Sequence, residues 1–173
     1  PKSGQWRDGF DLADMDGDGH LDLVHGPPRK GRGQPVIFLG DGRGHFNVWS
    51  TTSFPPLPYD YGDVKVADVN GDGAMDIALA AHLRGLTVLI YEGRGHYAPW
   101  AAGLELERQG TSDRAPFTSR RIAVIDWNLD KKPDLLALNE GPARLASAPR
   151  ATEAFALYLN RGGFWDSIAP AQS

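Results

Sequence analysis

The sequence contains no cysteine, which excludes disulfide bridges and thiolate metal sites. No apolar run approaches the roughly 18 residues that indicate a transmembrane helix, and no stretch keeps the period of a sustained amphipathic helix. The motifs of serine hydrolases and zinc peptidases, G-x-S-x-G and H-E-x-x-H, are also absent. We therefore expect a chain with little helix, no transmembrane segment and no catalytic residues.

Neither sign of charge is in large excess. The chain has 22 Asp and Glu against 18 Lys and Arg, a net charge of −4. Ten of the Asp lie in three short loops, and when these ten are set aside, 12 acidic and 18 basic residues remain. This basic surplus is too small to indicate nucleic-acid binding, and we expect no nucleic-acid partner. The length of 173 residues and the ordinary apolar content fit one domain with a core.

The sequence does contain a nine-residue motif that occurs three times. Residues 14–22 and 68–76 carry Asp or Asn at positions 1, 3, 5 and 9 and Gly at positions 4 and 6. Residues 126–134 keep the four oxygen-bearing positions but have Leu129 and Lys131 instead of the glycines. Clustered carboxylates repel one another unless a cation lies between them, and glycines permit the tight turn that brings them together. An all-oxygen set suits Ca²⁺ better than Zn²⁺, so the motif predicts a calcium loop.

The motif has two other possible interpretations. An EF-hand is rejected because it needs Glu at position 12, where this chain has His25, Leu79 and Ala137. An acidic turn held by Asx hydrogen bonds stays open, and it has most weight for the third loop. There Lys131 would need a left-handed backbone at a cost of about 1 kcal/mol, and Lys131 and Lys132 would repel a cation. We expect two structural calcium sites and a third that is weaker or absent.

Short, strand-like runs bounded by Gly, Pro, Asn and Asp surround each motif. One run precedes the loop and three follow it, and a glycine-rich turn comes before the last. The runs are 10–13, 21–24, 36–39 and 45–49; 64–67, 76–80, 86–91 and 96–100; and 122–125, 135–138, 155–159 and 164–165. The pattern predicts an all-β fold of three four-stranded antiparallel repeats, about 5–52, 60–103 and 118–171, within a single segment 1–173.

The glycine-rich turn also recurs. Residues 42–46 and 93–97 both read Gly-Arg-Gly-His followed by an aromatic residue, and residues 160–164 are a looser copy. His45 and His96 therefore occupy matching places, and we interpret them as residues that pin the turn by a hydrogen bond. A transition-metal site is the alternative for these two histidines.

The loop and the turn together make the chain resemble the FG-GAP, or VCBS-type, repeat family, in which D-x-[DN]-G-D-G-x-x-D precedes a turn of the form N-x-G-x-G-x-F. The resemblance covers nearly the whole chain and implies four-stranded blades of an integrin-α-like calcium-binding β-propeller. It also implies that a backbone carbonyl at position 7 completes each ligand set. The expected ligands are Asp14, Asp16, Asp18, His20 and Asp22; Asp68, Asn70, Asp72, Ala74 and Asp76; and Asp126, Asn128, Asp130, Lys132 and Asp134.

Three blades are too few to close a propeller, so we expect part of a larger ring of about six to eight blades. Further blades or self-association would then cover the open edges. In such blades the metal loops and glycine turns share one end, and the longer, variable loops share the other, where binding residues tend to lie. The candidate ligand-binding residues on these loops are Arg29, Arg32, Tyr59, Tyr61, Arg108, Arg114, Glu140 and Arg144.

The function expected from these features is that of a non-catalytic, lectin-like binding or adhesion module that recognises a protein or glycan. An extracellular, periplasmic or cell-surface location suits calcium sites of modest affinity. Two alternatives stay open. The segment could be the propeller portion of a secreted polysaccharide-degrading or other hydrolytic enzyme, or a structural subunit of a larger membrane-associated assembly.

Overall fold

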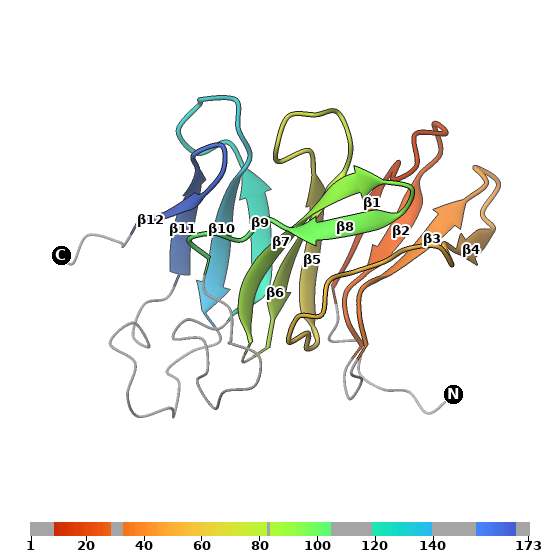
Figure 1. The fold of residues 1–173 in the computed structure, drawn as a ribbon, viewed down its shortest axis with the longest axis horizontal. Coiled ribbons are helices and arrows are strands. Elements are labelled where there is room, and N and C mark those ends of the chain that lie inside the picture. The colour runs from red at the N-terminus through yellow and green to blue at the C-terminus, as the bar shows by residue number, and fades with distance from the viewer. Residues whose placement is uncertain (1–8, 29–32, 83, 105–118, 140–154, 169–173) are drawn as a thin grey trace.

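The computed structural model describes residues 9–28, 33–82, 84–104, 119–139 and 155–168. The described part of the chain contains twelve β-strands and no helix (Figure 1). None of its elements is therefore a helix that could cross a membrane. Six of the candidate ligand-binding residues lie outside the described residues: Arg29, Arg32, Arg108, Arg114, Glu140 and Arg144.

The strands form three four-stranded antiparallel sheets, in which each strand pairs with the next one along the chain. This confirms the predicted all-β fold. The first sheet holds β1 (Phe10–Ala13), β2 (Asp22–His25), β3 (Val36–Gly40) and β4 (Phe46–Val48); the second holds β5 (Gly62–Ala67), β6 (Asp76–Ala81), β7 (Gly85–Gly93) and β8 (His96–Pro99); and the third holds β9 (Ser119–Ile125), β10 (Asp134–Asn139), β11 (Phe155–Asn160) and β12 (Trp165–Ile168).

The burial of each strand follows from the position of its sheet. The second sheet lies between the other two, and every residue of β6 is buried because both of its faces are covered. In the first sheet, β2 alternates between buried and half-buried residues, and in β1 the alternate residues are exposed. The period of two places one face of this sheet against the second sheet and leaves the other face open.

Two apolar cores join the three sheets face to face, as in adjoining propeller blades. The core between the first and second sheets contains Val24 and Ile37 on one side and Ile77, Leu89 and Tyr97 on the other. The core between the second and third sheets contains Ala78, Ala80, Leu86 and Val88 on one side and Ile122, Leu135, Ala137, Ala156, Tyr158 and Trp165 on the other. Each sheet is therefore stabilised by burial against its neighbour rather than alone.

The chain also links neighbouring sheets by hydrogen bonds along their outer and inner edges. At the outer edge, where β4, β8 and β12 lie, the backbone N–H of Ser53 donates to Gly95 O (2.9 Å) and the backbone oxygen of Ser53 accepts from Tyr97 N (2.9 Å). Trp165 N donates to Ala102 O (2.7 Å). At the inner edge, where β1, β5 and β9 lie, Val66 N donates to Asp11 Oδ2 (2.9 Å). Gly9 N donates to Gly62 O (2.6 Å), and Ile122 N to Asp63 Oδ2 (3.2 Å).

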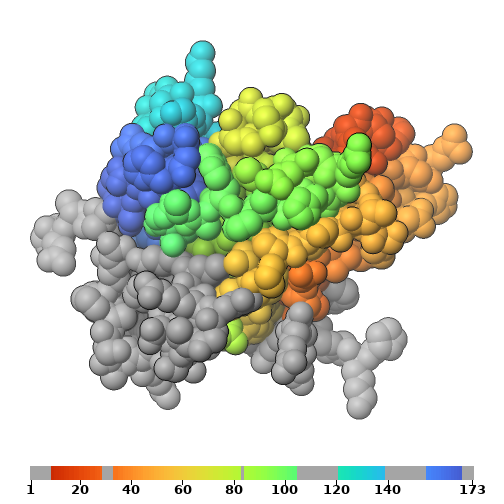
Figure 2. Space-filling view, viewed as in Figure 1, coloured from red at the N-terminus to blue at the C-terminus, as the bar shows by residue number. Residues whose placement is uncertain are grey.

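The three copies of the Asp-rich motif, residues 14–22, 68–76 and 126–134, form loops that we call the metal loops. They project from one end of the sheets, the upper end in Figure 1. The β3–β4, β7–β8 and β11–β12 turns lie toward the same end, whereas the end of β2 and the start of β3 lie at the opposite end. The same arrangement is visible in the space-filling view, where the loops form separate protrusions (Figure 2). The sheets thus place every copy of the Asp-rich motif on one side of the molecule.

Candidate metal centre

The first Asp-rich loop is a tight turn organised by its first carboxylate. Asp14 Oδ1 accepts hydrogen bonds from the backbone N–H groups of Gly17 (2.8 Å) and Asp18 (3.1 Å), and Asp14 Oδ2 accepts one from Gly19 (2.9 Å). Gly17 and Gly19 have φ of 81° and 87°, a region that glycine enters without strain. The two glycines therefore let the loop fold around the carboxylate, as the motif predicted.

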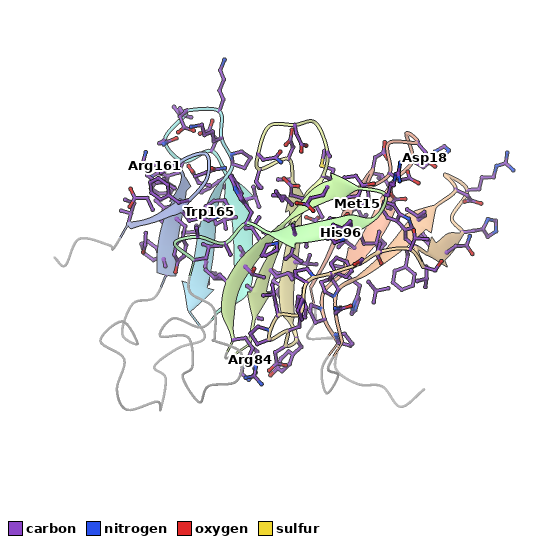
Figure 3. The ribbon with its side chains drawn as sticks, in the orientation of Figure 1. Met15, Asp18, Arg84, His96, Arg161 and Trp165 are labelled. Carbon is purple, nitrogen blue, oxygen red and sulfur yellow. The ribbon has the colours of Figure 1, made fainter. Side chains whose placement is uncertain are left out.

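This fold brings three carboxylates together. One carboxylate oxygen from each of Asp14, Asp16 and Asp18 lies within 4.8 Å of the others. Partial burial raises the pKa of Asp16, and the charges of Asp18, Asp22 and Asp14 raise it further. Figure 3 shows Asp18 at the loop, above Met15. The cluster could bind a metal ion, because a cation would relieve both the repulsion and the desolvation.

The second loop repeats the hydrogen bonds of the first. Asp68 Oδ1 accepts from Gly71 N (2.8 Å) and Asp72 N (3.1 Å), and Asp68 Oδ2 accepts from Gly73 N (2.9 Å). Asn70 replaces the second carboxylate, and its amide donates to Asp72 Oδ2 (2.8 Å). The oxygen-rich set still suits a hard cation, with one negative charge fewer than the first loop.

The third loop keeps the turn without its glycines. Asp126 accepts from Asp130 N (3.1 Å) and Lys131 N (3.0 Å), which are the counterparts of two contacts in the other loops. Leu129 and Lys131 have φ of 61° and 68°, so the predicted left-handed backbone at Lys131 is confirmed. A backbone hydrogen bond from Lys132 lowers the pKa of Asp130, helped by Asn128 and by the charges of Lys132 and Arg161. Because cationic side chains already offset its charge, this loop needs a metal ion less than the others do.

The carboxylate at position 9 ties each loop to its own sheet, a role that the motif alone did not predict. Asp22 is fully buried and accepts from Met15 N (2.7 Å) and Gly40 N (2.8 Å). Asp76 accepts from Val69 N and Tyr91 N, both at 2.9 Å. Burial raises the pKa of Asp76 to about 6, although both hydrogen bonds act in the opposite direction. Asp134 is likewise fully buried and accepts from Trp127 N (2.9 Å) and Asn160 N (2.8 Å).

The residues of the first two loops fit a calcium ion. Their ligand atoms are all oxygen, the glycine turn brings these atoms together, and a buried Asp lies at the base of each loop. A carboxylate oxygen that accepts one backbone hydrogen bond retains a second lone pair. The position-9 side chains and the position-7 carbonyls of His20, Ala74 and Lys132 stay predicted ligands on this basis.

Comparison with known protein families gives a match over part of the chain. Residues 14–79 match the family model described as an FG-GAP-like repeat. The match confirms the resemblance to this family for these residues. The matched residues run from the first metal loop to β6 and include the second metal loop. No curated protein matches the chain.

The histidines in the two Gly-Arg-Gly-His turns contact nearby carboxylates. His45 Nδ1 lies 2.7 Å from Asp41 Oδ2, and His96 Nε2 lies 3.4 Å from Glu92 Oε2. The hydrogen bond from His45 lowers the pKa of Asp41 to about 2. Among the described residues, the Asp14, Asp16 and Asp18 cluster is the one group of acids, histidines or cysteines with metal-binding spacing. The geometry therefore favours the turn-pinning interpretation over a transition-metal site.

Tyr59 and Tyr61 are the two candidate ligand-binding residues that the structure describes, and both pack against other residues of the chain. Tyr59 is half-buried, and its hydroxyl donates to Pro55 O (3.0 Å); burial raises its pKa. Tyr61 is buried and its ring lies 4.6 Å from that of His82. Both side chains support the connection between the first and second sheets, and their contact with a partner stays a prediction.

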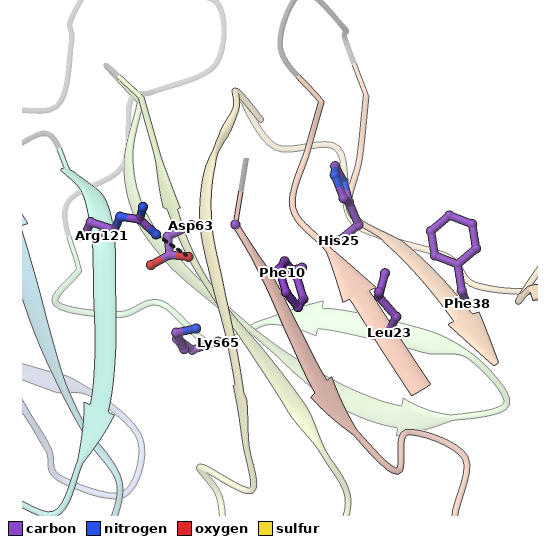
Figure 4. Close-up of a pocket in the computed structure, with 8 residues that line it drawn as sticks. Phe10, Leu23, His25, Phe38, Asp63, Lys65 and Arg121 are labelled. Carbon is purple, nitrogen blue, oxygen red and sulfur yellow. Dashed lines mark ion pairs between the residues drawn. The ribbon is translucent and has the colours of Figure 1, made fainter. Parts of the chain in front are cut away.

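A cavity of about 590 Å³ was not anticipated from the sequence. Its lining combines apolar and charged side chains from β1, β2, β3, β5 and β9 (Figure 4). Arg121 Nη1 lies 3.8 Å from Asp63 Oδ1, and Lys65 lies on the same side of the cavity. Phe10, Leu23 and Phe38 lie on the other side. These residues come from three sheets, so only a three-dimensional arrangement could bring them together.

Proposed function

We propose that this chain is a calcium-stabilised segment of a β-propeller that serves as a non-catalytic binding or adhesion module. The observation that carries the proposal is the carboxylate cluster of Asp14, Asp16 and Asp18. The second loop repeats its hydrogen-bond pattern at the same place in the next sheet. Each loop joins the first two strands of a sheet, so an ion held there would fix the geometry of that pair of strands.

Calcium is the cation that best suits these loops. It accepts six to eight oxygen ligands in flexible geometry, whereas Mg²⁺ requires a near-ideal octahedron and Zn²⁺ prefers nitrogen and sulfur. Short loops of this kind suit the modest affinities of extracellular calcium modules. The proposal therefore places the protein outside the cytoplasm, in the extracellular space, in the periplasm or at the cell surface.

The proposed binding surface is the end of the sheets opposite the metal loops. There the connections differ in length between repeats, and loops on a rigid scaffold commonly carry recognition. A protein or a glycan is the proposed ligand. The metal would act indirectly, because it rigidifies the scaffold at one end while the ligand binds at the other.

Titration calorimetry with calcium tests the metal sites. The wild-type chain should bind at least two calcium ions with dissociation constants of about 10⁻⁴–10⁻³ M. The double variant Asp16→Asn/Asp18→Asn should lose one of these sites and a corresponding part of the calcium-dependent rise in melting temperature. The matched control Asp41→Asn/Glu92→Gln removes two negative charges outside the loops and should bind calcium as the wild type does. Equal binding by both variants, or none by the wild type, would contradict the proposal.

Binding to arrays of glycans and of extracellular protein domains tests the module itself. The calcium-loaded chain should select a small set of related ligands and lose them in excess chelator, because the loops that recognise the ligand depend on a rigid scaffold. Release of product from polysaccharide substrates incubated with the same protein would instead favour the hydrolytic alternative.

A further inference from the structure

The two end sheets expose faces whose counterparts elsewhere in this chain are buried. Phe46 of β4, Tyr97 of β8 and Trp165 of β12 occupy equivalent positions in the three sheets. Each of them pairs with a residue of the third strand of its sheet, and the backbone N–H of that residue donates to the Asp at position 9 of the metal loop. Tyr97 and Trp165 are 1% and 2% exposed, whereas Phe46 is 46% exposed. We call the face of the first sheet that contains Phe46 the leading face.

The leading face carries apolar side chains on all four strands, together with His25 of β2. It contains Phe10 and Leu12 of β1, Leu23 of β2, Phe38 of β3, and Phe46 and Val48 of β4. The matching faces of the second and third sheets are the ones that form the two cores against the preceding sheet. The cavity shown in Figure 4 opens onto this face through Phe10, Leu23 and Phe38.

The opposite end of the molecule has the complementary feature. The second residue of each metal loop points toward the following sheet, and Met15 and Val69 are 3% and 4% exposed in the two cores. Their counterpart Trp127 is 59% exposed. Phe155 and Ile168 are also exposed on this side of the third sheet, which we call the trailing face.

We propose that a second copy of this chain closes the structure head to tail, with the trailing face of each copy against the leading face of the other. In both internal interfaces of this chain, a trailing face of one sheet covers the leading face of the next, so the second copy would continue the same packing. Trp127 would take the place of Met15 and Val69 and lie against Phe46 of the partner copy. Two copies give six blades, which falls within the range of about four to eight found in closed propellers.

Three features favour a second copy of this chain as the partner of the leading and trailing faces. Among the described residues, exposed apolar side chains remain on the leading face of the first sheet and on the trailing face of the third, although Leu157 and Leu159 on the trailing face are buried. One type of interface, used twice, would cover the exposed apolar residues of both faces. Exposed aromatic residues on both faces are the side chains that dominate stable interfaces. The cavity beside Phe10 and Phe38 provides room for the larger Phe155, whose counterpart in the second sheet is Leu86.

Sedimentation velocity of the full chain with calcium tests the proposal. The wild type should sediment at twice the 18.8 kDa mass of one chain at micromolar concentration. Phe46→Asp on the leading face and Trp127→Asp on the trailing face should each weaken association at least tenfold. The control Asn47→Asp adds a charge to the same strand as Phe46, and it should leave the association unchanged. Circular dichroism confirms that each variant is folded.

Mixing the two variants separates the head-to-tail contact from any other dimer. Phe46→Asp retains an intact trailing face and Trp127→Asp retains an intact leading face, so an equimolar mixture has one unaltered interface per pair. The mixture should therefore form pairs at concentrations at which each variant alone is monomeric. A monomeric wild type, assemblies of more than two copies, a dimer affected by only one of the variants, or a mixture that stays monomeric would each overturn the proposal.

Discussion

At the level of single residues, the third metal loop shows what two glycines contribute to this motif. Leu129 and Lys131 adopt the same left-handed backbone as the glycines of the other loops. Asp126 still accepts hydrogen bonds from the backbone N–H groups of Asp130 and Lys131, so the loop keeps its turn without glycine. The left-handed backbone at these two non-glycine residues is strained, and this strain lowers the stability of the loop.

Replacing Lys131 by glycine should raise the free energy of unfolding by about 0.5–1 kcal/mol. The relief of a left-handed backbone, about 1–2 kcal/mol, exceeds the additional entropy of glycine in the unfolded chain. Urea denaturation in the presence of chelator measures the effect without a contribution from calcium. The control Lys132→Gly removes the same charge at a residue that does not have positive φ, and it should lower stability. A change of the same sign in both variants would contradict the argument.

The buried Asp at position 9 shows how one residue can serve two purposes. Each of its oxygens accepts a backbone N–H, one from the loop and one from the third strand of the same sheet. These contacts order the loop before any ion binds. The raised pKa of Asp76 shows that the buried charge is costly, and a nearby calcium ion would offset that cost.

At the level of strands and sheets, stability depends on the links between neighbouring blades. Asn160 at the end of β11 is buried, and its amide donates to Val69 O (2.7 Å) in the second metal loop and contacts Pro133 O (3.3 Å). Its own oxygen accepts from Gly162 N (2.9 Å). One side chain thus connects the third sheet to the loop of the second.

The substitution Asn160→Ala should lower the free energy of unfolding by about 2–3 kcal/mol, because it leaves the Val69 carbonyl without its buried donor. Asn47→Ala is the matched control on an exposed strand and should change stability by less than about 0.5 kcal/mol. Thermal unfolding followed by circular dichroism measures both. Similar melting temperatures for the two variants would show that the link between the blades carries little energy.

The sequence predicted the strands well because they are short and bounded by turn residues. Every predicted run overlaps a strand of the structure, and the metal loops form where the motif placed them. Contacts between sheets were not predictable in this way. Asn160 and Val69 are 91 residues apart, and nothing local marks them as partners. Tyr61 lies beside His82 because β5 and β6 pair, a contact between residues 21 positions apart that the local sequence did not indicate.

At the level of the whole molecule, the charge of the chain is divided between its metal loops and the rest of its surface. The three loops contain ten Asp and two Lys, a formal charge of −8, and the rest of the chain carries a formal charge of +4. The net charge of −4 therefore reflects the metal end of the sheets. Each bound calcium ion would add two positive charges there, so occupancy of two loops would bring the formal charge to zero and a third ion would bring it to +2.

Electrophoretic mobility at pH 7 and low ionic strength should follow this change. The wild type should migrate toward the anode in chelator and lose almost all of that mobility in calcium, because two ions neutralise its formal charge of −4. Asp16→Asn/Asp18→Asn starts at −2 and should change by one ion only, so its shift should be about half that of the wild type. Equal shifts would place the second ion outside the first loop. A full reversal toward the cathode in the wild type would show that the third loop is occupied despite Lys131 and Lys132.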